Sequence, residues 1–423
     1  MSSFEFSFVV LASLVVVILA YLVLSKHEGS SINILTPSFV MAIPAFYLLP
    51  LVYLKLFGAE GSTYAHFYVY SSLAVELLTF VYAYTRTGDK VVRMPGASSY
   101  SNFGFVSLLC LSVGILLYVP VLIEFHEFIF DPRQIYTQTR TGFGTQGFVS
   151  STLAYVAVIL ILFSKRSKFV KVFTVFLATG LLSLHGSKGQ VLAVGLILLL
   201  YYVYVLKRKV TLARSMIVYA CTGILVVLLF VVTMSLGEDA ADALEAISSY
   251  SDYTRNAILV IDSHYPLQYG RITIESNTLG LVPRQLMPGK PKNFGTFALA
   301  EEFYPESFDR DMGSPAFGIG AQYADFGSLA IVYLALCGLF RGWLARVFVN
   351  RLKVTHHPSD FFMVAFLADI GLFPIGTGWL LPEALAVALF LRFVSRIGAP
   401  TVFRDTQRSA VSLRPMMLPR ADS

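Results

Sequence analysis

The sequence predicts an all-α fold, a polytopic transmembrane bundle of about eleven helices with one large extracytoplasmic loop. Of the 423 residues, 56% are hydrophobic and only 14% are charged, whereas an ordinary soluble domain carries about 25% charged residues. Apolar runs of membrane-spanning length recur along the chain, and Lys and Arg gather in alternate loops between them. This composition excludes a water-soluble enzyme and a disordered protein. A disulfide scaffold is also excluded, because the three cysteines all fall within apolar runs.

Each predicted span is an apolar run close to the length of about 20 residues that a helix needs to cross a bilayer. The runs lie at residues 4–24, 37–57, 64–84, 103–124, 148–163, 172–184, 191–206, 215–235, 320–349, 361–373 and 380–392. The last two are short and interrupted by Pro374 and Pro382, which predicts a half-membrane hairpin or a packed interior pair. No Lys or Arg precedes the first run and no cleavage site follows it, so we interpret it as a span and not as a signal peptide.

The distribution of charge predicts the topology and the division of the chain. Residues 1–236 would hold spans one to eight, 237–319 the large loop, 320–396 the last three spans and 397–423 a basic tail. Six alternate hydrophilic stretches carry 22 of the 32 Lys and Arg, while residues 237–315 carry a net charge of −6. By the positive-inside rule the basic side faces the cytoplasm. The C-terminus is then cytoplasmic, and the N-terminus and the large loop are extracytoplasmic.

Basic residues on the extracytoplasmic side are candidates for binding an anion, because Lys and Arg are disfavoured there. Arg133 and Arg140 are seven residues apart, a spacing that places both on one face if the segment is helical. Lys188 lies in a Gly-flanked turn just before an expected helix N-terminus, where backbone N–H groups favour a phosphate. The alternative is that these are ordinary solvated charges in turns.

The large loop is too long to be a simple connector. Its basic residues Arg271, Arg284 and Lys290 alternate with prolines. Arginine is suited to bidentate binding of a phosphate, through two parallel hydrogen bonds. His264 is a candidate general base, with Asp262 or Glu275 as substitutes. A proline-stiffened surface loop with incidental charges and a solvated histidine remains the alternative.

Glu76, Asp369 and Glu383 stand out among the acidic residues inside predicted spans. Acids within a membrane are costly and usually face protein or water. We expect hydrogen bonds to neighbouring helices in preference to a proton or ion pathway.

Several local motifs resemble one family of membrane enzymes. Asn33 and Pro37 before the second span resemble the family's Asn/Ser…Pro pattern at this place. His185 to Gly189 resembles a small-Ser-Arg-Gly turn shared with O-antigen ligases, with Lys188 in place of Arg. In the loop, Tyr269-Gly270, Val282-Pro283-Arg284 and Pro288-Gly289-Lys290-Pro291 resemble a Tyr-Gly…Ile-Pro-Arg…Trp-Pro-x-Lys-Pro pattern, with Met287 in place of Trp.

The helix that follows this loop begins with a matching Gly-x-x-Tyr-x-x-Phe-Gly pattern, whose tyrosine is Tyr323. With these motifs the chain resembles the bacterial O-antigen and exopolysaccharide repeat-unit polymerases (Wzy type). The resemblance implies a GT-C-like, metal-independent glycosyltransferase of the bacterial inner membrane that needs no cofactor. Its substrates would be undecaprenyl-pyrophosphate-linked oligosaccharides, and the growing glycan would pass to a terminal sugar hydroxyl of another lipid-linked repeat unit.

The resemblance and the residue chemistry together assign roles to the candidates. Cations are needed where negative charge develops on a pyrophosphate leaving group, and Arg284 and Lys188 are placed there as catalytic residues beside His264. The substrate-binding residues would be Arg133, Arg140, Arg271, Lys290, Tyr269 and Tyr323. Expected partners are a chain-length-regulating co-polymerase and a flippase, and nucleic acid is not expected.

Three other functions compete with this interpretation. One is a non-catalytic assembly scaffold of a polysaccharide export complex, which predicts that Arg284 and Lys188 can be replaced by Gln without loss of polymer. An O-antigen ligase would use the same donor with a different acceptor, and sequence separates it poorly from a polymerase. A polysaccharide transporter or flippase would predict charged residues along the spans and two repeated halves. The sequence shows few intramembrane acids, no repeat and a long polar loop, which disfavours transport.

Overall fold

The computed structural model describes residues 3–58, 60–88, 102–129, 134–135, 143–186, 188–211, 213–215, 217, 252–282, 286–311, 315–368 and 382–397. Every regular element within these ranges is a helix, which confirms the predicted all-α class. The elements are α1 (Ser3–Glu28), α2 (Thr36–Ala42), η1 (Ile43–Leu48), α3 (Leu49–Phe57), α4 (Thr63–Arg86), α5 (Phe103–Glu124), η2 (His126–Phe128), α7 (Gly144–Phe163), α8 (Lys168–Leu184), α9 (Lys188–Leu200), η3 (Tyr201–Val205), α12 (Asp252–Asp262), α13 (Arg271–Thr278), η5 (Leu279–Leu281), α14 (Phe297–Phe303), α15 (Pro305–Asp311), α16 (Gly320–Phe326), η6 (Gly327–Leu329), α17 (Ala330–Thr355), α18 (Pro358–Leu367) and α19 (Pro382–Ile397).

Six helical segments of the described chain are long and apolar enough to cross a membrane. They are Glu5–Glu28, Thr36–Phe57, Thr63–Arg86, Phe103–Glu124, Gly144–Phe163 and Gly320–Thr355. Shorter apolar helices occupy Gly189–Val205, Pro358–Leu367 and Ala384–Ser395. This is the multi-pass membrane bundle that the hydropathy pattern predicts. Most of the predicted span 215–235 lies outside the described residues.

Prolines explain the segments that depart from regular helix. Pro37, Pro44 and Pro50 fall within the second span, whose middle turn widens to a π-helix at Ile43–Leu48. Pro44 and Pro50 lie farther along the span and lack the N–H that the helix would use, so the backbone adjusts locally. Pro37 lies in the first turn of α2, where that N–H has no helical partner.

α18 ends at Leu367 after ten residues. A helix of that length covers about 15 Å, roughly half the thickness of a bilayer core. Residues 369–381 lie outside the described structure, so the half-membrane hairpin stays a prediction.

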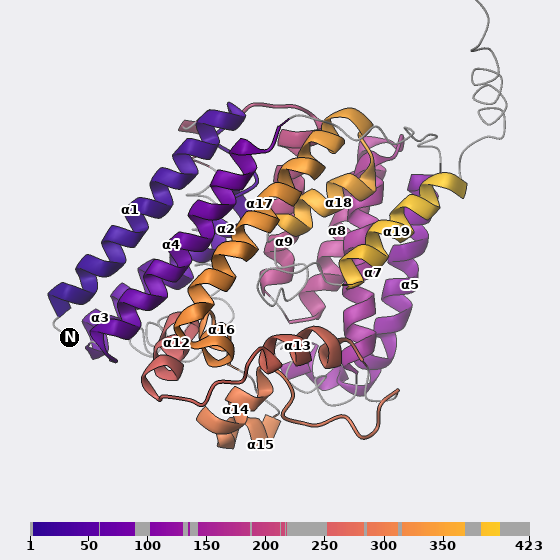
Figure 1. The fold of residues 1–423 in the computed structure, drawn as a ribbon. Coiled ribbons are helices and arrows are strands. Elements are labelled where there is room, and N and C mark those ends of the chain that lie inside the picture. The colour runs from indigo at the N-terminus through magenta and orange to yellow at the C-terminus, as the bar shows by residue number, and fades with distance from the viewer. Residues whose placement is uncertain are drawn as a thin grey trace, which may run out of the picture.

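Among the described helices the most extensive contact joins α4 to α17, which run side by side in Figure 1. Gly338 and Gly342 of α17 face α4 so closely that an added Cβ would lie 2.3 Å from the Glu76 carbonyl oxygen and 2.2 Å from that of Phe80. Two glycines four residues apart are a recurrent solution for close helix packing in membranes. The Glu76 carboxylate forms an ion pair with Arg341 of α17 at 3.1 Å. This contact to a neighbouring helix agrees with the expectation for Glu76, whereas Asp369 and the side chain of Glu383 lie outside the described residues.

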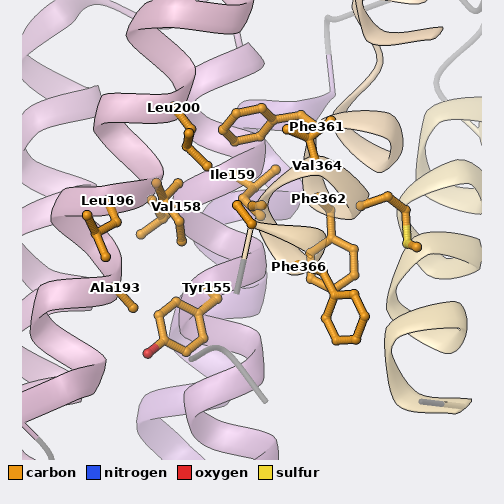
Figure 2. Close-up of a cluster of buried hydrophobic side chains, with 14 of the residues drawn as sticks. Tyr155, Val158, Ile159, Ala193, Leu196, Leu200, Phe361, Phe362, Val364 and Phe366 are labelled. Carbon is orange, nitrogen blue, oxygen red and sulfur yellow. The ribbon is translucent and has the colours of Figure 1, made fainter. Parts of the chain in front are cut away.

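A second packed region surrounds α7. Figure 2 shows Tyr155, Val158 and Ile159 of α7 between side chains of α9 and α18. Ile159 and Phe361 are fully buried in this cluster. Because α7 is covered on most sides, its buried residues form nearly continuous runs and show no single apolar face.

The helices of the large loop gather at one end of the bundle. α12, α13, α14 and α15 lie at the lower end in Figure 1, and the N-terminus lies at that same end. Ion pairs with Glu28 and Asp360 join helices in the rest of the bundle: Glu28 pairs with Arg346 at 3.5 Å, and Asp360 pairs with Arg351 at 3.1 Å and with Arg392 at 3.3 Å. With α12, α13, α14 and α15 at one end of the bundle (Figure 1), the described part of the predicted loop forms a folded layer there.

Candidate functional site

The loop layer is anchored by Asp325 of α16. Its carboxylate accepts hydrogen bonds from the backbone N–H of Ile272 at 2.9 Å and of Thr273 at 2.8 Å, and from the Thr273 hydroxyl at 2.6 Å. A buried carboxylate at a helix N-terminus is stabilised by the free N–H groups and by the helix dipole. α13 is thereby fixed to the helix that begins the ninth predicted span.

α16 also packs tightly against α12. A Cβ on Gly320 would lie 2.8 Å from the Cα of Ala257, so a side chain there would push the two helices apart. This glycine begins the Gly-x-x-Tyr-x-x-Phe-Gly pattern, and its role is close packing. The motif therefore positions the loop on the membrane bundle.

Two of the predicted binding residues flank the start of α13. Tyr269 has a positive φ of 52° and is 83% exposed. The side chain of Arg271 is about half exposed, and its Nε donates to Glu275 Oε1 at 2.8 Å. The hydrogen bond and charge of Glu275 raise the pKa of Arg271. Arg271 thus presents a permanently charged guanidinium at the surface of the loop layer.

The two carboxylates considered as substitute bases are both engaged in the fold. Glu275 accepts from Arg271 and also from the backbone N–H of Gly295 at 2.8 Å. Asp262 accepts from the backbone N–H and the hydroxyl of Ser62 at 2.6 and 2.5 Å, which joins α12 to the start of α4. His264 is exposed just after α12, with a positive φ of 55°. Of these three candidates, His264 is the one whose side chain the described structure leaves free of hydrogen bonds.

Lys290 and Tyr323 take up partly internal positions. Lys290 is buried, its ammonium donates to the Val282 carbonyl at 3.0 Å, and its Nζ lies 4.1 Å from the centre of the Phe294 ring. It therefore helps to hold the loop together. Tyr323 is half-buried, and its ring meets that of Tyr68 edge to face at 5.0 Å.

The side chains of the remaining predicted residues lie outside the described structure. Lys188 is the first residue of α9, which agrees with its expected position at a helix N-terminus. Its side chain lies outside the described structure, as do Arg133, Arg140 and Arg284. Within the described residues no group of three His, Cys, Asp or Glu could hold a metal ion.

A second polar cluster, which the sequence analysis did not single out, lies where α12 meets α3 and α4. The guanidinium of Arg255 lies 4.0 Å from the centre of the Tyr53 ring and pairs with Glu60 at 3.4 Å and Asp252 at 3.5 Å. His66 is 3% exposed, and its Nε2 lies 2.6 Å from the Glu60 carbonyl oxygen. Two features of the sequence could have indicated this cluster. They are His66 in the first turn of a predicted span and Arg255 in an acidic loop.

Tyr53, Glu60, His66 and Arg255 line a small cavity with an empty volume of about 380 Å³, including the part open to solvent. Phe6 of α1 and Pro50 and Leu54 of α3 supply apolar walls. The complete lining is Phe6, Pro50, Tyr53, Leu54, Gly58, Glu60, His66, Tyr70, Thr254, Arg255 and Ile258. The cavity thus combines aromatic surface with polar groups at the loop end of the bundle.

Comparisons with known proteins bear on the family. No family model matches the chain, and no solved structure matches it. The O-antigen polymerase of Salmonella typhimurium is 33% identical over 391 residues, which cover 92% of this chain and 95% of that protein. The O-antigen polymerase of Salmonella typhi matches to the same extent. Because the identity extends over nearly the whole of both proteins, the chain belongs to the O-antigen polymerase family of Wzy type.

Proposed function

We propose that the protein is a repeat-unit polymerase of O-antigen biosynthesis that uses a polyprenyl-pyrophosphate-linked glycan as donor. The observation that carries this proposal is the full-length similarity to two O-antigen polymerases. The membrane bundle with a folded loop layer on one end supports it, because a lipid-linked substrate must be met at a membrane surface.

The proposed reaction is a direct glycosyl transfer. The bond between the growing glycan and its pyrophosphate breaks, and a new glycosidic bond forms to a terminal hydroxyl of another lipid-linked repeat unit. The hydroxyl proton passes to a base, and undecaprenyl pyrophosphate leaves. We assign the base to His264, which is exposed at the loop layer and is not held by a carboxylate.

Cationic side chains take the place of a metal in this proposal. Arg284 and Lys188 would stabilise the charge that develops on the leaving pyrophosphate. Arg133, Arg140 and Arg271 would bind the remaining phosphate charge, and the exposed guanidinium of Arg271 supports that role. Lys188 at the start of α9 supports a phosphate contact, since helix N-terminal N–H groups also bind anions.

The proposed topology follows from charge. Residues 237–319 form a periplasmic loop, the N-terminus is periplasmic and the C-terminal residues 397–423 are cytoplasmic. The N-terminus and the loop helices lie at the same end of the bundle, which supports this assignment. A flippase would deliver the lipid-linked units to this side, and a co-polymerase would set the chain length.

The test is the size distribution of the glycan made in a deletion strain. The strain is complemented with wild type, Arg284→Ala, Lys188→Ala or His264→Ala at matched membrane levels. Loss of the ladder with accumulation of single repeats is expected for each variant. Lys168→Ala removes a positive charge from the exposed start of α8 and should keep the ladder.

Other outcomes of the same experiment overturn parts of the proposal. Accumulation of long lipid-linked polymer in the deletion strain would indicate a ligase, and unchanged glycans would exclude both enzymes. Metal independence is tested with purified protein and lipid-linked repeats, where polymerisation should persist in excess EDTA. Loss of activity in EDTA that added Mg²⁺ restores would contradict it.

A further inference from the structure

The cavity between α1, α3, α4 and α12 is lined by residues that do not include Arg271, the one residue assigned to the pyrophosphate whose side chain the structure describes. Its empty volume of about 380 Å³ includes a part that is open to solvent, so a ligand can enter it from outside the protein. It is built by segments far apart in sequence, since Arg255 and Glu60 pair across 195 positions. Such a site exists only in the folded protein.

His66 is the main polar group of this cavity. The carbonyl of Glu60 can only accept a hydrogen bond, so His66 Nε2 carries the proton and Nδ1 of the neutral ring is an acceptor. Nδ1 is buried and has no partner among the described residues. Arg255 Nε, a donor on another lining residue, is likewise buried without a partner. Buried polar atoms without partners are unusual and costly, and a hydroxyl can satisfy both kinds.

The charges around the cavity favour a neutral ligand. The one guanidinium of Arg255 is already paired with two carboxylates, those of Glu60 and Asp252. A phosphate would add further negative charge at a place where negative charge is already in excess. A sugar carries no charge, and its hydroxyl groups both donate and accept.

The lining and the position of the cavity also favour a sugar as its ligand. Tyr53, Tyr70 and Phe6 offer aromatic surface beside the polar groups, a combination of apolar walls with a few placed polar atoms that is typical of ligand sites. Arg255 stacks on Tyr53 and belongs to α12, the first described helix of the loop layer. The cavity therefore lies where the loop layer meets the membrane helices.

We propose that this cavity is the subsite for a neutral sugar of the acceptor repeat unit, bound through His66, Arg255 and Tyr53. This inference rests on the proposed function, because it concerns the acceptor of the same reaction. In this proposal His66 and Arg255 bind the acceptor sugar. The pyrophosphate of the donor is bound by the cationic residues assigned to it under the proposed function.

The test uses the repeat oligosaccharide released from its lipid by mild acid as the probe. Without pyrophosphate it cannot act as a donor, so its binding is measured without turnover, and the His66 and Arg255 variants decide whether it binds in this cavity. Full-length Tyr53→Trp protein in nanodiscs is titrated with this oligosaccharide, and a saturable change in tryptophan fluorescence is expected. His66→Gln in the same background should weaken binding about tenfold, since one hydrogen bond to the ligand is lost. Arg255→Lys should weaken binding to a similar extent. Lysine keeps the positive charge but lacks the planar guanidinium group that stacks on Tyr53 and donates several hydrogen bonds.

His126→Gln is the matched control, because His126 is exposed beyond the end of α5 and does not line the cavity. It should leave the titration unchanged. Inorganic pyrophosphate as the probe should give no signal. Where a variant does not give a monodisperse peak in size exclusion, Tyr53→Leu is tested in its place, in membranes. The free oligosaccharide should inhibit polymerisation by Tyr53→Leu less than it inhibits polymerisation by wild type.

The outcomes separate this inference from the proposed function. If wild type polymerises but the oligosaccharide gives no signal, or binds His66→Gln and Arg255→Lys as well as the parent, the subsite is wrong and the polymerase assignment stands. If pyrophosphate gives the signal instead, the cavity binds anions and the inference is overturned. If wild type makes no polymer, the proposed function itself fails.

Discussion

Replacing Gly342 by alanine tests the packing on which the membrane bundle depends. The added Cβ would lie 2.2 Å from the carbonyl oxygen, 2.9 Å from the carbonyl carbon and 3.0 Å from the Cα of Phe80. All three atoms belong to the backbone of α4, so no side-chain rotation can relieve the clash. An ordinary contact begins at 3.4 Å, and α17 must therefore move away by about 1.2 Å, far enough to loosen the interface along its length.

The expected cost is at the upper end of the range for overpacked interiors, about 3 kcal/mol. Movement of α17 would also lengthen the 3.1 Å pair between Arg341 and Glu76, which lies on the same interface. The assay is the midpoint of thermal aggregation of detergent-solubilised protein, followed by fluorescence size exclusion. We expect a clear fall for Gly342→Ala and a similar fall for Gly338→Ala, whose Cβ would lie 2.3 Å from a backbone oxygen.

The chain offers a matched control for this change. Gly180 of α8 and Gly195 of α9 are also glycines within helices, but nothing lies within 4 Å of an added Cβ. Alanine there should leave the midpoint unchanged or raise it slightly, because alanine is the better helix former. If Gly342→Ala is as stable as Gly180→Ala, the close approach of α4 and α17 is wrong.

Two further predictions concern single polar contacts. Asp325→Asn puts an amide N–H opposite the N–H of Thr273 and should cost about 2 kcal/mol, seen as faster proteolysis of the loop layer. His357 accepts from the Ser359 N–H at 3.1 Å, and burial lowers its pKa to about 4. Because the unfolded chain then takes up a proton first, stability should fall as the pH drops from about 6.5 toward 4. His357→Asn retains an acceptor at this N-cap and should reduce that slope.

The controls for these two predictions are specific. Asp309→Asn, an exposed aspartate in the same loop, should leave proteolysis unchanged; equal protection of Asp325→Asn and wild type would show that Asp325 does not anchor α13. For His357, stability is measured at pH 7 and pH 5. An identical loss between these pH values in wild type and in His357→Asn would exclude His357 as the source. Burial also lowers the pKa of His356, so some slope should remain in the variant.

Local hydropathy was sufficient to predict most of the described membrane helices. α5 has the predicted bounds, Phe103 and Glu124, because the apolar run stops at polar residues on both sides. The predicted ninth span is longer in the structure and continues to Thr355. Its last turns carry Arg351 and Lys353, whose charges hide the end of the helix from a hydropathy pattern.

The sequence by itself determined the class of the protein and contained the motifs that resemble polymerases, and it predicts the division into membrane spans and one large loop. These properties follow from the composition and order of neighbouring residues, which are local. Only the tertiary structure decided that Asp325 caps α13, that Lys290 and Glu275 hold the loop together, and that Arg255 meets Glu60 and His66 at a cavity. Each of those contacts joins groups whose closeness depends on how helices pack, and no pattern along the chain records that distance.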